Sequence, residues 1–400
     1  MHEENRIMRN STISAKVLML VGFLLSFVIC YLYARSITLV YGAVELAIAA
    51  VCYLGSLKRH RMMDKNLLIY AVATVGFAWC AGVFSGDFKS TLLVTVPLLM
   101  PLYISTMKIT YKGWTDFVPA TIVAVVIVYL AVQVGVFGYI NSNTVGFLGF
   151  MGVSLGVLWI KNAKKKLLPT AIVLFGFYYA IQSGSRNVAI VGLICAVLLF
   201  MPKTTVKKRT YYFAVCLIVI AYSVFAMDIM EWMFSKPKLY QFLVDYTEQY
   251  SEKAWEMADR IAFLRRVQNM IAQRNILLQL FGTGALTTHG HNMFYQCILN
   301  FGYVGAALIY AGFCRVFKMA YVLICNKHDD VALGCVIILW GMFLLQGADV
   351  FMVGPETYAV VPQVIMGIIL NRYGAYRNEY GDTNRVGDRS MRYKETKNVA

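Results

Sequence analysis

Apolar runs of roughly 17 to 25 residues recur along nearly the whole chain, and they constrain its fold more than any other feature. Each run can cross about 30 Å of hydrocarbon as an α-helix, because a helix satisfies its own backbone hydrogen bonds. Hydrophobic residues make up 59% of the sequence and charged residues 14%, whereas soluble domains carry about 25% charged residues. The sequence therefore predicts an all-α, polytopic membrane protein.

We expect about twelve of these runs to be transmembrane helices. They lie at 17–34, 37–57, 67–84, 91–107, 117–137, 144–160, 167–183, 187–201, 211–227, 292–313, 331–350 and 357–370. One outer connector is much longer than the others, and it divides the chain. The expected parts are the first spans (1–227), a large extracytoplasmic loop with catalytic elements (228–291), the last spans (292–371) and a disordered basic cytoplasmic tail (372–400).

The positions of Lys and Arg predict the orientation, because short cytoplasmic loops carry an excess of both. The basic connectors follow the even-numbered spans, and they read KRHRMMDK, KITYK, KNAKKK and PKTTVKKR. Most of the 37 Lys and Arg residues then fall on one side with both termini, which we expect to be cytoplasmic. The net charge of +16 reflects this bias. A nucleic-acid partner is not expected, because that would need a basic soluble face.

The large outer loop contains an amphipathic segment, RIAFLRRVQNMIAQRNILLQLFG, at 260–282. The spacing of a helix places its apolar side chains on one stripe, formed by Leu264, Val267, Ile271 and Leu278. Polar side chains occupy another face, with Arg265, Asn269 and Gln273. We expect an amphipathic helix on the outer membrane surface. Gly282 and Gly284 would end it, because glycine permits turn geometry that other residues resist.

Two histidines stand at the mouth of the tenth span, in the sequence THGHN. His289 and His291 face the outside in this topology, where an imidazole with a pKa near neutrality suits a general base. Capping of the helix or binding of interfacial water is the structural alternative. Metal binding by the pair is another, but a closed zinc site takes three or four ligands and no third His or Cys is near. We expect no metal and no cofactor.

Four arginines are expected at the outer membrane surface, where the two histidines are expected too. Arg186 lies between two apolar runs, where an arginine is costly unless it meets a partner or a functional anion. Arg260, Arg265 and Arg266 lie in the outer loop. Together these guanidinium groups could hold a diphosphate leaving group without a metal. The structural alternatives are snorkelling of Arg186 to lipid head groups and a solvated helix face for the loop arginines.

Two further charged residues are candidates in the first spans. Glu45 lies near the middle of the second span, where a carboxylate is a functional candidate by default. A neutral glutamic acid that is hydrogen-bonded to a neighbouring helix would explain Glu45 equally well. Arg35 lies near the outer surface and is a candidate for lining a sugar groove.

The order and sidedness of these features resemble a known family. The SGSR motif at 183–186, the large outer loop, and then FGTG, HGHN and NFGYVG are similar to the O-antigen polymerase and ligase superfamily, also called Wzy/WaaL-like. The resemblance covers nearly the whole chain. It implies inverting, metal-independent glycosyl transfer from an undecaprenyl diphosphate-linked saccharide, at the outer face of the bacterial plasma membrane. The chain is most like an O-antigen or capsular polysaccharide repeat-unit polymerase.

The resemblance also implies roles for individual residues. Arg186 and Arg265 would neutralise the diphosphate, and His291 would orient or deprotonate the acceptor hydroxyl. Arg265 fits the spacing of the loop arginine best, Arg260 fits a slightly longer one, and the aromatic residue usual after that arginine is missing. We expect substrate contacts from Arg260, Arg266, His289, Asn292, Arg35 and Glu45.

Three functions remain as expectations. A polymerase would transfer the growing chain to a new lipid-linked repeat unit, whereas a ligase would deliver the finished polymer to a lipid A core sugar or another acceptor. A lipid-linked saccharide flippase or other transporter belongs to a different class, typified by internal repeats and broken helices, and no convincing repeat appears. The expected partners are the undecaprenyl diphosphate-linked oligosaccharide, membrane lipids and, as a candidate, a chain-length regulator protein.

Overall fold

The computed structural model of this chain is almost entirely helical. It describes residues 13–14, 17–18, 20–21, 65–85, 99–107, 109–111, 142–182, 186–200, 209–234, 251–283, 292–345 and 361–377. Within these ranges the strands are two residues long each, β1 (Ile13–Ser14) and β2 (Ile109–Thr110), and they pair in parallel. The all-α prediction is confirmed for this part of the chain.

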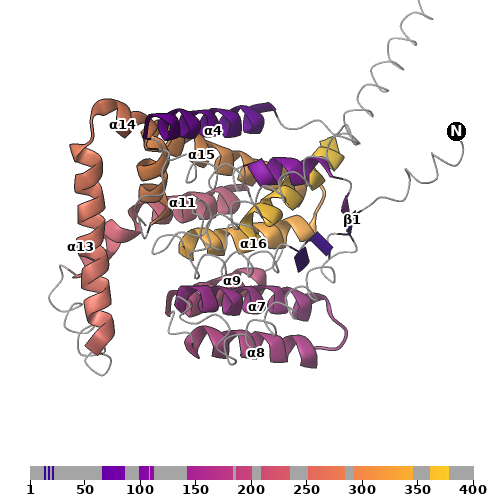
Figure 1. Cartoon of the computed structure of the whole chain (residues 1–400). Helices are drawn as coiled ribbons and strands as arrows, with labels where there is room; N and C mark the ends of the chain where they lie inside the picture. The colour runs from indigo at the N-terminus through magenta and orange to yellow at the C-terminus, as the bar shows by residue number, and fades with distance from the viewer. Residues whose placement is uncertain are drawn as a thin grey trace, which may run out of the picture.

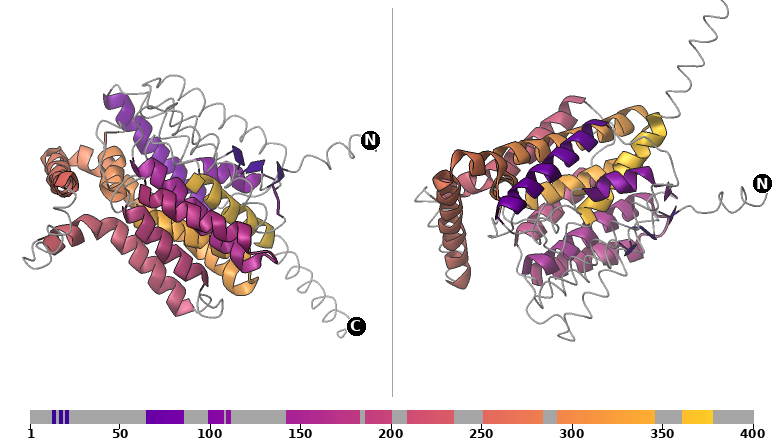
Figure 2. Two further views of the ribbon diagram at one scale, coloured as in Figure 1. Left: turned by 90° about the horizontal axis from the view of Figure 1, so that it is seen from below. Right: turned by 45° about the horizontal axis from the view of Figure 1, so that its top comes forward.

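Most of the helices form one bundle, and α13 runs across one end of it (Figure 1). The helices are α4 (Lys65–Ser85), α7 (Ser142–Asn162), α8 (Leu167–Gln182), α9 (Arg186–Phe200), α11 (Arg209–Phe234), α13 (Ser251–Gln273), α14 (Ile276–Phe281), α15 (Met293–Asn326) and α16 (Asp330–Leu345). Two further helical stretches cover 99–106 and 361–377. Figure 2 shows α13 at the same end of the bundle from two other directions.

Every described helix except α13 and α14 overlaps a predicted apolar run. Two helices in the described ranges are long and apolar enough to cross a bilayer: α15, and α11 through its stretch Arg209–Ala226. Five apolar helices are shorter, at Lys65–Cys80, Gly149–Lys161, Leu167–Ile181, Val188–Leu199 and Asp330–Leu345. The described part of the chain therefore carries two candidate spans, and a total of about twelve stays a prediction.

The core of the bundle is built around α16, whose side chains are nearly all buried. It contacts α7, α9, α11 and α15. The ring centroid of Trp340 lies 5.3 Å from that of Tyr212 in α11. The centroid of Phe343 lies 4.8 Å from that of Phe313 in α15. Because aromatic pairs bury much apolar area, they hold α11 and α15 against α16.

The end of the bundle away from α13 joins segments from both ends of the sequence (Figure 1). Ile13 of β1 pairs with Ile109 of β2 there. The Tyr111 hydroxyl donates to Asn371 Oδ1 at 3.2 Å. Arg372 pairs with Asp329 at the start of α16, with Nε and Oδ2 2.5 Å apart. Residues near both termini therefore lie at one end of the bundle.

The prediction of one continuous helix over 260–281 is wrong. Instead, α13 ends at Gln273 and α14 begins at Ile276. The backbone of Asn275 between them is extended, and its Oδ1 accepts a hydrogen bond from the Leu278 N–H at 2.9 Å. An asparagine in this position caps a new helix. Leu278 therefore lies on a different helix from the rest of the predicted apolar stripe.

Helix α15 extends beyond the predicted end of its span at 313 and continues to Asn326. Its buried face continues over the same distance, because Val316, Ala320 and Leu323 are buried while Lys318 is exposed. An apolar face at helical spacing that packs on the protein can support a helix beyond the predicted span. Lys318, which lies beyond the predicted span, is thus on the exposed side of a helix.

Candidate functional site

Helix α15 is broken shortly after it begins. Gly302 adopts φ 67 and ψ −177, which separates the stretch 293–301 from the rest of the helix. A Cβ atom on Gly302 would lie 2.2 Å from the carbonyl carbon of Leu280. Both the positive φ and this close approach require glycine. The break therefore depends on contact with the end of α14.

The turn at Phe281–Thr283 packs into this break. Gly282 has φ 74, and a Cβ atom on it would lie 2.4 Å from the carbonyl oxygen of Asn300. The Thr283 N–H and hydroxyl both donate to the Leu299 carbonyl, at 3.4 and 3.3 Å. The break interrupts the helical hydrogen-bond ladder, and a buried carbonyl without donors is costly. The turn supplies two donors to the Leu299 carbonyl.

Arg274 supplies a third donor to the same carbonyl. Its Nη1 lies 2.9 Å from the Leu299 oxygen. The guanidinium is half-buried, and this burial lowers its pKa from the ordinary value. Arginine still stays charged at neutral pH. Arg274 was not among the residues predicted from the sequence, because its partner is a backbone carbonyl that no side-chain motif marks.

Helix α13 packs on the start of α15 through its apolar stripe. Leu264, Val267 and Ile271 are buried, with 4%, 0% and 4% of their surface exposed. The opposite face is exposed, as the spacing predicts, at Arg265, Asn269 and Gln273. Gln268 Nε2 also donates to the Tyr295 hydroxyl of α15 at 2.7 Å. The arginine-bearing helix is thereby fixed to the first turn of α15.

Asn292 caps α15 and ties it to α11. Its Oδ1 accepts from the N–H groups of Phe294 and Tyr295, at 2.9 and 3.2 Å. Its Nδ2 donates to the Ser223 carbonyl at 3.1 Å. The side chain is fully buried. These bonds give Asn292 a structural role that the sequence did not predict, and its contact with substrate stays a prediction.

Buried polar side chains continue from Asn292 into the bundle. Ser223 Oγ lies 3.1 Å from the Tyr310 hydroxyl. Within the stretch 293–301, Gln296 Nε2 donates to Asn300 Oδ1 at 3.0 Å. The Nδ2 of Asn300 has no hydrogen-bond partner in the described structure, although the side chain is buried. The start of α15 is therefore more polar than a plain membrane span.

The structure describes some of the predicted site residues. Arg265 and Arg266 lie on the exposed face of α13, and Arg260 lies in the same helix. Arg186 is the first residue of α9. Figure 1 shows the turn from α7 to α8 at the end of the bundle away from α13. Helix α8 therefore ends, and α9 begins, toward the end that α13 crosses.

Four predicted residues lie outside the described ones: Arg35, Glu45, His289 and His291. The residues that flank the histidine-bearing segment 284–291 are described, and both are held. Thr283 bonds to the Leu299 carbonyl, and Asn292 caps α15. Both attachments involve the first part of α15. Among the described residues, no group of three or more His, Cys, Asp and Glu side chains is placed to hold a metal ion.

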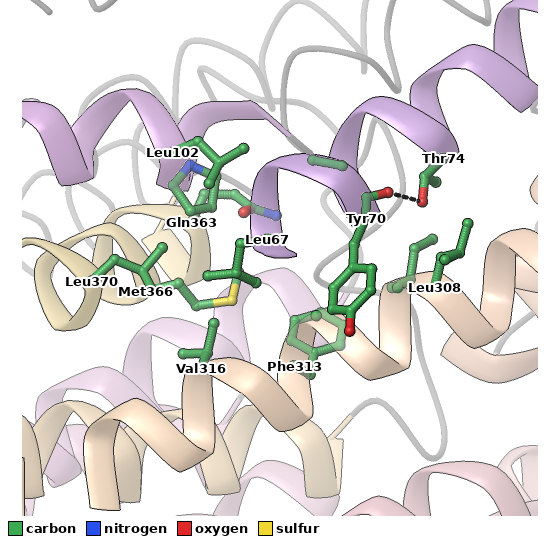
Figure 3. Close-up of a pocket in the computed structure, with 14 residues that line it drawn as sticks. Leu67, Tyr70, Thr74, Leu102, Leu308, Phe313, Val316, Gln363, Met366 and Leu370 are labelled. Atoms are coloured by element: carbon green, nitrogen blue, oxygen red, sulfur yellow. Dashed lines mark hydrogen bonds between the residues drawn. The ribbon is translucent and has the colours of Figure 1, made fainter. Parts of the chain in front are cut away.

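A separate apolar pocket of about 80 Å³ lies between α4, α15 and the stretches 99–106 and 361–377 (Figure 3). Its labelled walls include Leu67, Phe313 and Met366. The Thr74 hydroxyl at its edge donates to the Tyr70 carbonyl at 2.7 Å. Of the predicted site residues that the structure describes, none lines this pocket. It is distinct from the cluster at the start of α15.

Neither a scan of protein-family models nor a search of curated proteins gave a match to this chain.

Proposed function

We propose that the chain is a polysaccharide polymerase of the bacterial plasma membrane. It joins undecaprenyl diphosphate-linked oligosaccharide repeat units into O-antigen or capsule by inverting, metal-independent glycosyl transfer. One observation supports this function most directly. The helix with Arg265 and Arg266 and both ends of the histidine-bearing segment gather at the start of α15. The reaction needs arginines for the diphosphate and a histidine for the acceptor hydroxyl, close together at the outer membrane surface.

The topology that this function requires is an outward-facing site on about twelve spans, with both termini cytoplasmic. Helix α13 supports it, because it crosses one end of the bundle with its apolar stripe packed on the protein and its polar, arginine-bearing face exposed. The segments near both termini, Ile13–Ser14 and 371–372, lie at the opposite end. The basic connector between α7 and α8 lies at that end too, as the excess of Lys in cytoplasmic loops requires.

The proposed reaction exchanges one bond for another at the anomeric carbon of the donor. The acceptor hydroxyl oxygen bonds to that carbon from one face while the bond to the diphosphate oxygen breaks on the other, which inverts the configuration. His291 takes the proton of the hydroxyl. Undecaprenyl diphosphate leaves, with its charge neutralised by Arg186 and Arg265.

The remaining predicted residues serve binding in this mechanism. Arg260 and Arg266 on α13 contribute further positive charge for phosphate, and His289 contacts the saccharide. Arg35 would line the sugar groove, and Glu45 would contact the substrate. Holding donor and acceptor together on the lipid surface supplies much of the rate, because it replaces a bimolecular encounter by an oriented one. No metal is needed for any of these steps.

A lipid-linked saccharide transporter is the second candidate, and one observation favours it. Helix α15 is broken at Gly302, and broken helices often line transporter sites. Here the turn at Phe281–Thr283 packs into the break, and the Leu299 carbonyl is occupied by protein donors. A ligase would use the same residues as the polymerase with a different acceptor. The acceptor therefore has to be varied to separate polymerase from ligase.

Purified protein in nanodiscs, given a synthetic undecaprenyl diphosphate repeat unit in EDTA, tests the function. The products are followed by mass spectrometry. We expect a ladder of longer lipid-linked saccharides from the wild type and none from His291→Ala or Arg186→Ala. An unconsumed repeat unit contradicts the polymerase. Adding candidate acceptors then separates a ligase, which forms product, from a transporter, which does not.

A further inference from the structure

We propose that Arg274 is a positioning residue for this reaction. Its guanidinium holds the turn at Phe281–Thr283 against the break in α15, and so holds the point where the histidine-bearing segment begins. The inference rests on the proposed function. It goes beyond it because Arg274 belongs neither to the predicted diphosphate-binding arginines nor to any motif.

Three donors converge on one acceptor at the break. The Leu299 carbonyl receives Arg274 Nη1 at 2.9 Å, and the Thr283 N–H and hydroxyl at 3.4 and 3.3 Å. The arginine bond is the shortest of the three, and a charged donor makes a stronger bond than a neutral one. Arg274 and Thr283 come from opposite ends of α14. The shared carbonyl therefore fixes both ends of α14 to one point on α15.

The backbone of Arg274 is itself held between the two helices of the loop. Its N–H donates to the Ile271 carbonyl at 3.2 Å. Its carbonyl accepts from Gln279 Nε2 at 2.8 Å. A guanidinium on a fixed backbone has less freedom to lose when it binds. Half-burial, which lowers the pKa of the group, is also unlike an arginine that only faces solvent.

The turn that Arg274 holds has contacts on two other sides. The ring centroid of Phe281 lies 5.1 Å from that of Phe77 in α4. Gly282 and Gly302 approach so closely that neither leaves room for a Cβ atom. The segment 284–291 leaves this turn and ends at Asn292, which caps α15. Arg274 thus controls one of the two attachments of the segment that carries His291.

The partner of Arg274 is a neutral carbonyl, which separates this role from diphosphate binding. The positioning role needs an N–H donor at position 274 that reaches the Leu299 carbonyl. Thr283 donates to the same carbonyl oxygen. Substitutions of Arg274 and Thr283 should therefore be coupled, because both weaken the same attachment. An arginine that contacts the diphosphate would instead act independently of Thr283.

The test measures kcat and KM for polymerisation. We expect Arg274→Met, which keeps the apolar stem and removes the donors, to lower kcat about 10- to 100-fold with KM nearly unchanged. Arg274→Lys should regain most of the loss, because its ammonium can donate to the carbonyl. Combined with Thr283→Val, Arg274→Met should lose less than the product of the two single losses. Gln273→Ala, an exposed neighbour, serves as the control and should match the wild type.

Hydrogen exchange gives a reading that does not depend on activity. The Thr283 N–H is bonded to the Leu299 carbonyl, so the peptide over 281–283 should be protected in the wild type, Arg274→Lys and Gln273→Ala. Arg274→Met should exchange faster there. If Arg274→Met does not purify folded, Thr283→Val decides, because it removes one donor to the same oxygen. Faster exchange with lower kcat then supports the role, and no change in either overturns it.

The outcomes separate the two proposals. A wild type that makes no product overturns the proposed function and this inference with it. If the wild type is active, three results would overturn the inference alone. They are an unchanged kcat in Arg274→Met, unchanged exchange in that variant, and a double variant whose loss of kcat equals the product of the Arg274→Met and Thr283→Val losses. The inference is supported if Arg274→Met lowers kcat and speeds exchange over 281–283, if Arg274→Lys restores kcat, and if the effects of Arg274→Met and Thr283→Val are coupled.

Discussion

At the scale of single residues, Asn292 joins two helices through one amide group. We expect Asn292→Ala to lower the free energy of unfolding by at least about 1 kcal/mol, because it removes the cap of α15. Asn292→Ser should restore the cap, but it is too short to replace the bond to the Ser223 carbonyl. Thermal unfolding in detergent should rank the wild type first, Ser second and Ala last. Equal midpoints for Ser and Ala would contradict the role as a cap.

The two glycines at the break in α15 make a second prediction at this scale. Gly302→Ala should destabilise the protein by about 2 kcal/mol or more, because a Cβ atom there meets Leu280 and the φ is positive. Gly76→Ala is the matched control, since a Cβ atom on Gly76 meets nothing within 4 Å. The control should be neutral or slightly stabilising, as alanine favours a helix. Equal thermal midpoints for the two variants would show that the close approach at the break is not needed.

At the scale of elements, the packing of α13 on the bundle can be tested. Val267 is fully buried on the apolar stripe, whereas Met270 on the same helix is 40% exposed. Val267→Ser should weaken the packing by roughly 2 kcal/mol, because it removes buried apolar surface and buries a hydroxyl. Limited proteolysis within 251–273 should then speed up, while Met270→Ser should leave it unchanged. Equal cleavage of both variants would contradict the packing.

The helices themselves were largely predictable from the sequence, but their breaks were not. A long apolar run must form a helix in hydrocarbon, and the stripe of Leu264, Val267 and Ile271 follows from helical spacing. The break at Gly302 depends on its contact with Leu280, and a glycine in NFGYVG does not indicate it. Arg274 escaped prediction for the same reason, because its partner lies 25 residues away in the backbone.

At the scale of the whole molecule, the ends of the bundle should lie on opposite sides of the membrane. Asn269→Cys on the exposed face of α13 should react with an impermeant maleimide added to intact cells. Lys164→Cys, in the turn between α7 and α8, should react only after permeabilisation. The unsubstituted protein gives the background from its own free cysteines. Labelling of both positions from outside would contradict the proposed topology.

The break in α15 also bears on the order in which the chain can fold during synthesis. Arg274 and Thr283 leave the ribosome before Leu299 does, so the donors exist before the carbonyl that they bind. Because earlier parts of a chain can fold first, the completed turn can serve as a template on which the stretch 293–301 is bent as it arrives. In the reverse order, the stretch 293–326 would form an unbroken helix first and bend afterwards.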